Sequence, residues 1–313
     1  MRIACISDTH LTVTDPNSKS LFPRHLDSLP EEKRSALYEE LRSGIELAYI
    51  RTMESLRNSG PWDAIIHLGD ITGGYGESGC AHHEEARKLT LRCRSDMQRI
   101  APRVFACVGN HDLGYGHIGS LEADVTTASV EFCEQTFGPL FWSFDAGGIL
   151  CIGICSSFAD YKGKDPTLLK RAHEQKVFIA DTLASTKDPW ILFSHSPWSA
   201  KFLAREITPH LTRLKQMISG DLHDPKKAWV IKSARRVLPI AQSNVLFHCL
   251  RNWTFCPSTA PLWWQGYQCL GLSVNAFGVA EEVIHGVLPM KNLPTASFMR
   301  CTWWCVKPKP KQS

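Results

Sequence analysis

Short apolar runs that each end in polar residues are the most regular feature of the chain. Five of them are rich in β-branched or aromatic residues, which is typical of buried strands. They are RIACIS from Arg2, DAIIHL from Asp63, RVFACV from Arg103, WILFS from Trp190 and LKQMIS from Leu214. Because an open α/β sheet places its binding site at the carboxyl ends of its strands, the polar residues after these runs are candidate functional groups.

Stretches with helical periodicity separate the runs. We expect helices from about Glu31 to Asn58, from about Cys80 to Ile100, and from Pro166 to Leu183. The stretch GPLFWSFDAGGILCIGICSS predicts a β-hairpin with strands at Phe141–Phe144 and Ile149–Ile154. Strands and helices therefore alternate first, and antiparallel character increases later in the chain.

Length and composition indicate an ordinary soluble α/β protein. The 313 residues are 43% hydrophobic and 21% charged, and the net charge of +4 gives no reason to expect nucleic acid or a membrane surface as partner. The 12 cysteines follow no repeating framework, and several lie in apolar runs, which favours reduced thiols and a cytoplasmic location. The charge at Asp8 comes too early for a signal peptide, and no run approaches the ~18–20 apolar residues of a membrane span.

The residues that follow the strand-like runs form a set of metal-ligand types. The set is Asp8, His10, Asp70, Asn110, His111, His195, Asp221 and His223. Carboxylate, imidazole and carboxamide groups without cysteine suit Mn²⁺, Fe, Zn²⁺ or Mg²⁺ rather than a structural thiolate zinc. An aspartate can bridge two ions, and ions about 3.5–4 Å apart activate water and clamp the oxygens of a phosphoryl group.

In order along the chain, the motifs D-T-H, G-D, G-N-H-D, H and G-D-L-H run from Asp8 to His223. They resemble the calcineurin-like metallophosphoesterase family, whose pattern is D-x-H, G-D, G-N-H-[DE], H and G-H-x-H. The resemblance implies a four-layer α/β/β/α sandwich of two mixed sheets with helices outside. We expect one domain over residues 1–300, with the Trp-rich part from about residue 245 as a cap or extra strands, and a tail over 301–313 that is disordered at its end.

The resemblance also implies a role for each motif residue. One metal would be bound by Asp8, His10, Asp70 and His223, and the second by Asp70, Asn110, His195 and Asp221, with Asp70 bridging. His111 would face the phosphate and protonate the leaving oxygen or stabilise charge, and Asp112 would orient it.

The activity implied by the resemblance is hydrolysis of a small phosphorylated substrate by a metal-bridging hydroxide. Two divalent ions are expected as cofactors, with Mn²⁺ as the first choice and Fe, Zn²⁺ or Mg²⁺ as alternatives. A phosphomonoesterase and a phosphodiesterase both remain open. Two alternatives are a nuclease of the same family and a non-catalytic interaction scaffold with a degenerate metal site. The oligomeric state stays open.

Asp221 is the departure from the family pattern, which has histidine at this position. Three interpretations stay open: Asp221 binds the second metal and favours oxygen-preferring ions such as Mn²⁺, it does not reach the metal, or His248 replaces the missing histidine. His67, inside the second strand-like run, is interpreted as a strand residue that packs or donates to the backbone. Substrate specificity is expected to depend on Thr12–Pro30, on Gly73–Gly79 and on the late tryptophans.

Overall fold

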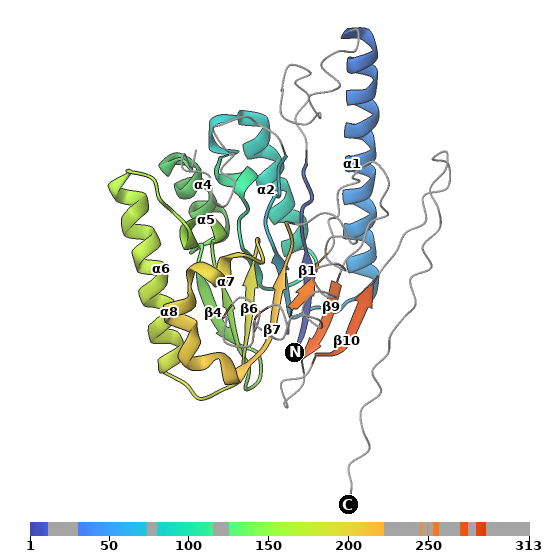
Figure 1. Ribbon diagram of the computed structural model, residues 1–313. Coiled ribbons are helices and arrows are strands. Elements are labelled where there is room, and N and C mark those ends of the chain that lie inside the picture. The colour runs from blue at the N-terminus through green and yellow to red at the C-terminus, as the bar shows by residue number, and fades with distance from the viewer. Residues whose placement is uncertain are drawn as a thin grey trace, which may run out of the picture.

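The protein is built from two five-stranded sheets packed face to face, with helices on both outer sides (Figure 1). The computed structural model describes residues 1–11, 31–73, 80–114, 125–221, 245, 249, 253–256, 270–274 and 280–285. In Figure 1 the layers run from α6 on the left, through the two sheets, to α1 on the right. The predicted four-layer arrangement is confirmed.

The first sheet contains the first three predicted strands. Its order is β10 (Ala280–His285), β9 (Leu270–Val274), β1 (Arg2–Ile6), β2 (Ala64–His67) and β3 (Val104–Ala106). β1, β2 and β3 are parallel, whereas β9 is antiparallel to both β1 and β10. Because β1, β2 and β3 are parallel neighbours, the residues that follow them meet at one edge of the sheet.

The second sheet holds the hairpin and the last two predicted strands. Its order is β4 (Trp142–Asp145), β5 (Leu150–Gly153), β6 (Trp190–Ser194), β7 (Leu214–Ser219) and β8 (Trp253–Phe255). β4 and β5 are antiparallel, and the pairs from β5 to β8 are parallel. Both sheets are therefore mixed, as predicted. The extension of the chain beyond residue 245 contributes strands to both of them.

The helices connect and cover the sheets. They are α1 (Glu31–Ser59), α2 (Glu84–Gln98), α3 (Asn110–Leu113), α4 (Thr127–Phe137), α5 (Ser156–Ala159), α6 (Pro166–Ala184), α7 (Ser199–Phe202) and α8 (Ala204–Ile207), with 3₁₀ turns η3 (Cys80–His82) and η4 (Thr208–Arg213). The prediction of one helix over Cys80–Ile100 is wrong at its start. His83 has extended backbone (φ −126°, ψ 117°), so the α-helix begins only at Glu84, where two acidic side chains favour the positive end of the helix dipole.

Alternation along β1 explains the layers. Ile3 and Cys5 belong to the buried cluster between the two sheets, together with Phe193 of the second sheet. Ala4 and Ile6 point the other way, into the cluster that α1 and α2 cover. Successive strand residues face opposite sides of a sheet, so the four apolar residues of β1 fill two separate cores.

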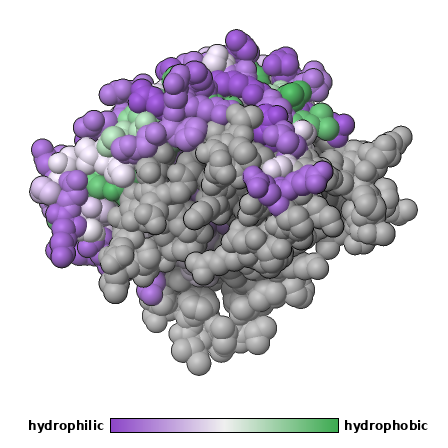
Figure 2. All heavy atoms as spheres, turned by 90° about the horizontal axis from the view of Figure 1, so that it is seen from above, coloured by the Kyte–Doolittle hydropathy of each residue, from purple (hydrophilic) through white to green (hydrophobic). Residues whose placement is uncertain are grey.

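Three further observations bear on the expectations from composition. The nine cysteines within the described ranges are all free and buried. None of the helices in the described part of the chain combines the length and the apolar character needed to cross a membrane. The described surface visible from above is mostly hydrophilic, with small hydrophobic patches (Figure 2).

Candidate metal centre

The candidate residues gather at the carboxyl ends of β1, β2, β3, β6 and β7. Four residues there have left-handed backbone: Asp8 (φ 52°), His10 (φ 43°), Asp70 (φ 53°) and Asp221 (φ 68°). Such conformations cost about 1–3 kcal/mol each and persist only where surrounding contacts impose them. Backbone hydrogen bonds from Asp8 N to Gly69 O (2.9 Å) and from His10 N to Asp70 O (3.0 Å) hold the two loops side by side.

Asp70 lies at the centre of the group. Its Oδ2 atom is 3.3 Å from His195 Nε2, 3.7 Å from His10 Nε2 and 3.9 Å from His111 Nε2. Its other oxygen, Oδ1, accepts a hydrogen bond from the backbone N–H of His111 at 3.0 Å. One carboxylate therefore faces imidazoles from three different loops.

The orientation of His195 follows from its hydrogen bonds. The Nδ1 atom lies 2.7 Å from the carbonyl oxygen of Leu68, which can only accept, so Nδ1 carries the proton. Asp70 Oδ2 and Asn110 Oδ1 lie 3.3 and 3.2 Å from Nε2, so a bound metal ion would meet the Nε2 lone pair of a neutral ring that is protonated only on Nδ1. This is the tautomer that a metal-ligating histidine adopts when a backbone carbonyl fixes its other nitrogen.

Asn110 and His111 occupy the first turn of α3, and Asp112 anchors that turn. Asp112 Oδ2 accepts from Gly109 N (2.9 Å), and its Oδ1 accepts from Ile71 N (2.9 Å) and Thr72 N (3.2 Å). Asp112 therefore ties the loop after β3 to the loop after β2. It fixes the backbone from which His111 projects.

Asp221 lies directly after β7 and touches the group through both its backbone and its side chain. Its N–H donates to Asp8 Oδ2 at 3.2 Å, and Ser7 Oγ donates to the same oxygen. Its own Oδ1 is 3.8 Å from His195 Nε2, and its side chain is 29% exposed. The fifth motif thus reaches the site, and its backbone conformation is also left-handed (φ 68°).

Two glycines allow the close approach of these loops. A Cβ on Gly109 would lie 2.1 Å from Asp70 Oδ1, and a Cβ on Gly220 would lie 2.4 Å from Asp8 Oδ2. Neither position can hold a larger residue without moving a candidate ligand. The glycines of the G-N-H-D and G-D-L-H motifs are thus explained by packing.

Charge concentrates in this buried region. Although burial raises it, the pKa of Asp70 is held well below its usual value by His195 and His111. Burial lowers the pKa of His195, but the charge and hydrogen bond of Asp70, together with the charges of Asp221 and Asp8, raise it well above its usual value. Burial, followed by the charge of Asp70, raises the pKa of Asp112 to about 7, against the hydrogen bonds from Gly109 and Thr72. The site attracts positive charge.

The donor set fits divalent metal ions. Asp8, Asp70 and His195 form one fully buried group whose ligand atoms all lie within 4.8 Å of one another, and His10, Asp70 and His111 form a second. Ligand atoms that share one ion at ~2.1 Å lie roughly 3–4 Å apart, close to the separations around Asp70 Oδ2. Asp70 is common to both groups, as a bridging carboxylate would be.

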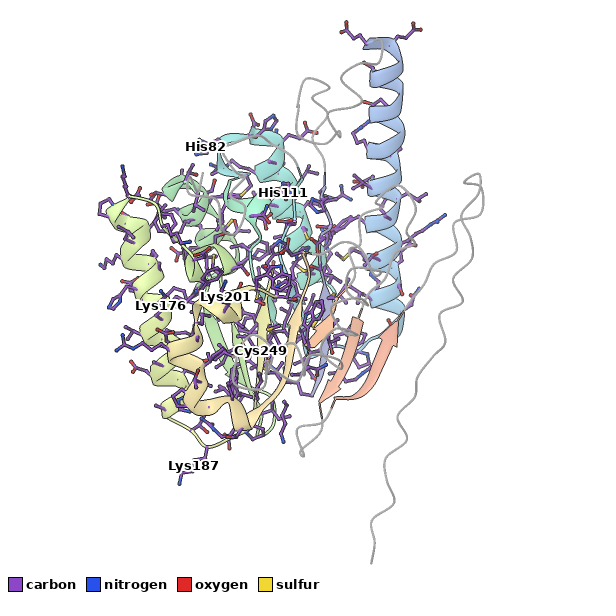
Figure 3. All side chains as sticks on the ribbon, viewed as in Figure 1. His82, His111, Lys176, Lys187, Lys201 and Cys249 are labelled. Atoms are coloured by element: carbon purple, nitrogen blue, oxygen red, sulfur yellow. The ribbon has the colours of Figure 1, made fainter. Side chains whose placement is uncertain are left out.

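The structure brings Asp8, His10, Asp70, Asn110, His111, His195 and Asp221 to one edge of the sheets, with Asp112 behind them. In Figure 3, His111 lies near the upper end of the strands and Lys187 marks the opposite end. His223 and His248 lie outside the described residues, as do nearly all residues of the two predicted specificity loops and most of the late tryptophans.

Sequence reasoning missed Ser7 and Thr9, and of its two interpretations of His67 the packed strand residue is the one observed. His67 is a buried strand residue, as interpreted, but its Nδ1 accepts from the backbone N–H of Gly69 (3.1 Å) instead of donating. Ser7 and Thr9 are polar residues that flank Asp8, and this adjacency to a predicted ligand was the available signal.

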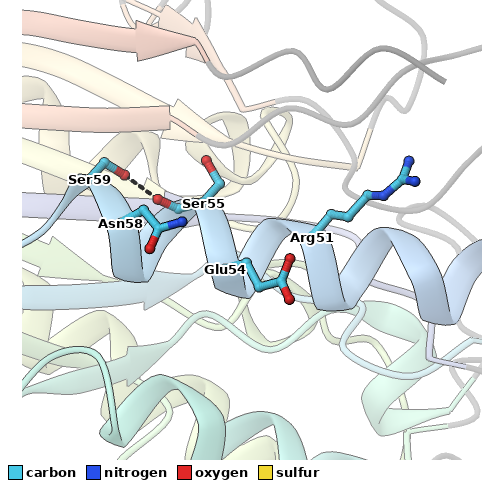
Figure 4. A pocket seen from close by; sticks show the side chains of 5 residues that line it. All are labelled: Arg51, Glu54, Ser55, Asn58 and Ser59. Carbon is cyan, nitrogen blue, oxygen red and sulfur yellow. Dashed lines mark hydrogen bonds between the residues drawn. The ribbon is translucent and has the colours of Figure 1, made fainter. Parts of the chain in front are cut away.

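A separate hollow of about 500 Å³ lies on the last turns of α1, lined by Arg51, Glu54, Ser55, Asn58 and Ser59 (Figure 4). None of the candidate ligands belongs to α1. The hollow is therefore not part of the candidate metal centre.

The comparison with protein-family models agrees with the resemblance of the motifs. Residues 1–225 match the family model described as calcineurin-like phosphoesterase. Phosphopantetheinyl hydrolase (PptH) from Mycobacterium tuberculosis is similar in structure at 15% identity, with a TM-score of 0.35, over 71% of this chain and 82% of that one. GAP50, the anchor in the inner membrane complex of Plasmodium, is similar at 12% identity, with a TM-score of 0.43, over 93% and 90%. The comparison with curated proteins gave no match.

Proposed function

The chain belongs to the calcineurin-like phosphoesterase family, and we propose that it hydrolyses phosphoesters at a centre of two divalent metal ions. The observation that carries the proposal is the position of Asp70. Its Oδ2 faces His195 on one side and His10 on the other, at 3.3 and 3.7 Å, so a single carboxylate is shared by two potential ligand groups.

The ligand assignment follows the family pattern, with Asp70 shared between the two ions as it is shared between the two spatial groups. Asp8, His10 and Asp70 would hold one ion, together with His223, whose role stays a prediction. Asp70, Asn110, His195 and Asp221 would hold the other; Asn110 Oδ1 and Asp221 Oδ1 lie 3.2 and 3.8 Å from His195 Nε2. When bound, the ions would supply a water acidic enough to attack phosphorus and a clamp for the phosphoryl oxygens.

His111 is proposed to act on the substrate. Its side chain is 18% exposed, whereas those of Asp70 and His195 are 1% exposed each, so an incoming phosphate can reach His111 more easily than either of them. An imidazolium there would stabilise charge on the phosphoryl oxygens or donate a proton from Nε2 to the leaving oxygen. Asp112 supports this role by anchoring the turn that carries His111.

Asp221 is proposed to be a ligand that sets the choice of metal. With Asp8 and Asp70 it would bring three negative charges to the centre, where the family pattern, with histidine at 221, brings two. Carboxylate oxygens favour Mn²⁺ over softer ions. The geometry that supports this is the 3.8 Å between Asp221 Oδ1 and His195 Nε2.

The experiment measures metal content and hydrolysis on the same protein. The purified chain is loaded with Mn²⁺, and its metal stoichiometry and its hydrolysis of p-nitrophenyl phosphate and bis(p-nitrophenyl) phosphate are determined. Two ions per chain and hydrolysis of one ester are expected, and the preferred ester distinguishes a monoesterase from a diesterase. Asp70→Asn should lose metal and activity, whereas Asp181→Asn, at an exposed position of α6, should lose neither. Fewer than one ion per chain with no hydrolysis would favour the interaction scaffold.

A further inference from the structure

Thr9 and His67 are buried polar side chains that lie directly behind the candidate ligands. We propose that they form a positioning pair that fixes the relative placement of the two ligand-bearing loops, and through it the affinity for metal. The inference rests on the proposed function, because it concerns the same centre. Neither side chain is itself proposed to touch a metal ion.

The donor and the acceptor can be assigned for each hydrogen bond of the pair. The backbone N–H of Gly69 can only donate, so His67 Nδ1, 3.1 Å away, is the acceptor and carries no proton. In the neutral ring the proton is therefore on Nε2, which donates to Thr9 Oγ1 at 3.1 Å. The Thr9 hydroxyl then donates its own proton to the carbonyl oxygen of Ile71 at 2.8 Å. Each of these three hydrogen bonds therefore has one defined donor and one defined acceptor.

The residues joined by these hydrogen bonds lie on both sides of the candidate ligands in the sequence. Thr9 stands between Asp8 and His10 in the first loop, and the other two anchors, Gly69 and Ile71, flank Asp70 in the second. A shift of either loop would stretch at least one of the three bonds. The pair therefore fixes the backbone on both sides of the bridging carboxylate.

The backbone conformation of the two loops explains why these hydrogen bonds are needed. Asp8, His10 and Asp70 all hold left-handed backbone, which other contacts must maintain. His67 is 0% exposed and Thr9 is 1% exposed, so water does not compete for their hydrogen bonds. Groups that orient metal ligands in this way typically contribute 10- to 100-fold in metal affinity.

The test measures Mn²⁺ affinity of the metal-free full-length chain by isothermal titration calorimetry. Thr9→Val removes the hydroxyl and keeps the shape, and Thr9→Ser restores the hydroxyl. Thr9→Val should weaken Mn²⁺ binding by about 10- to 100-fold, and Thr9→Ser should stay within about threefold of wild type. Thr90→Val is the matched control, since Thr90 is an equally buried threonine that donates to Ala86 O in α2. It should lower the melting temperature of the metal-free protein without changing Mn²⁺ affinity.

A second substitution tests whether the two side chains act together. His67→Asn keeps an acceptor for Gly69 N–H but cannot reach Thr9, so it should weaken binding to a similar degree. If both act through their shared bond, the double variant should lose much less than the product of the two single losses. Should Thr9→Val not fold, His67→Asn measured against Thr90→Val carries the test alone.

The outcomes separate this inference from the proposed function. Wild type that binds no Mn²⁺ would overturn both. Wild-type binding with Thr9→Val or His67→Asn unchanged would overturn the positioning pair alone. Losses that multiply in the double variant would also overturn it, because they would show two independent effects.

Discussion

Substitution of Asp221 tests the one position where the chain departs from the family pattern. Because Asp221 has φ 68°, alanine there would add backbone strain, so asparagine and glycine are the cleaner replacements. Asp221→Asn keeps the shape and removes the charge. Asp221→Gly removes the whole side chain, and glycine adopts the left-handed backbone without strain.

The expected magnitude follows from the charge and its distance. Asp221 Oδ1 lies 3.8 Å from His195 Nε2. An ion bound by that nitrogen would therefore lie within about 4 Å of the Asp221 carboxylate. A unit charge about 4 Å from a divalent ion contributes about 8 kcal/mol at an effective dielectric constant of 20. The side chain is 29% exposed and water would replace it, so we expect about a quarter of this, ~2 kcal/mol, to remain. That corresponds to about 30-fold weaker binding of one ion.

Calorimetry of metal-free protein with Mn²⁺ provides the measurement. Asp221→Asn should bind one ion as wild type does and the second about 30-fold more weakly, and Asp221→Gly should bind the second at least as weakly. Asp221→His should keep two ions and shift preference toward Zn²⁺ in competition with Mn²⁺. Unchanged stoichiometry and affinity in both Asp221→Asn and Asp221→Gly would refute the assignment and leave Asp221 as a turn residue.

Three further substitutions test other parts of the structure. His111→Ala should keep both ions but lower kcat by about 10²–10⁴, and an equal loss of metal would contradict its proposed role. Gly109→Ala places a Cβ 2.1 Å from Asp70 Oδ1, so metal analysis should show reduced binding and calorimetry a lower melting temperature. Asp165 accepts from the N–H groups of Leu168 and Thr167 at the start of α6, which lowers its pKa. Its stabilisation is present above the ordinary aspartate pKa and is lost as pH falls through the lowered folded-state value. Asp165→Asn should therefore lower the melting temperature at neutral pH, with a difference that shrinks in acid; a constant difference would exclude the charge as its cause.

Strands β1, β2 and β6 were predictable because nearly all their residues are buried, on both faces of the strand. The run RIACIS reads as continuous apolar sequence because Ile3 and Ala4 fill different cores, and the same holds for WILFS in the second sheet. Pro166 and Asp165 mark the start of α6 in the sequence, and the helix begins there. Sequence reasoning did not find α4, because its 11 residues are too few to show clear periodicity and its Thr126 cap is visible only in the structure.

For the candidate site, the ligand types and their order were predictable and their mutual geometry was not. Motif order depends on the positions of strand ends along the chain, which the apolar pattern marks. The tautomer of His195 depends on the carbonyl of Leu68, which is 127 residues away in sequence. The Thr9–His67 contact likewise joins residues 58 apart, and nothing local in either segment indicates it.

The left-handed backbone at residue 221 has a consequence for which amino acids this position can hold. A φ of 68° is unfavourable for β-branched and bulky side chains, and outside glycine it is populated mainly by asparagine, aspartate and histidine. The backbone conformation therefore limits which amino acids can occupy position 221, independently of metal binding. Aspartate and the histidine of the family pattern can both adopt this conformation, so an exchange between them changes the charge of the centre without changing the backbone conformation of the loop.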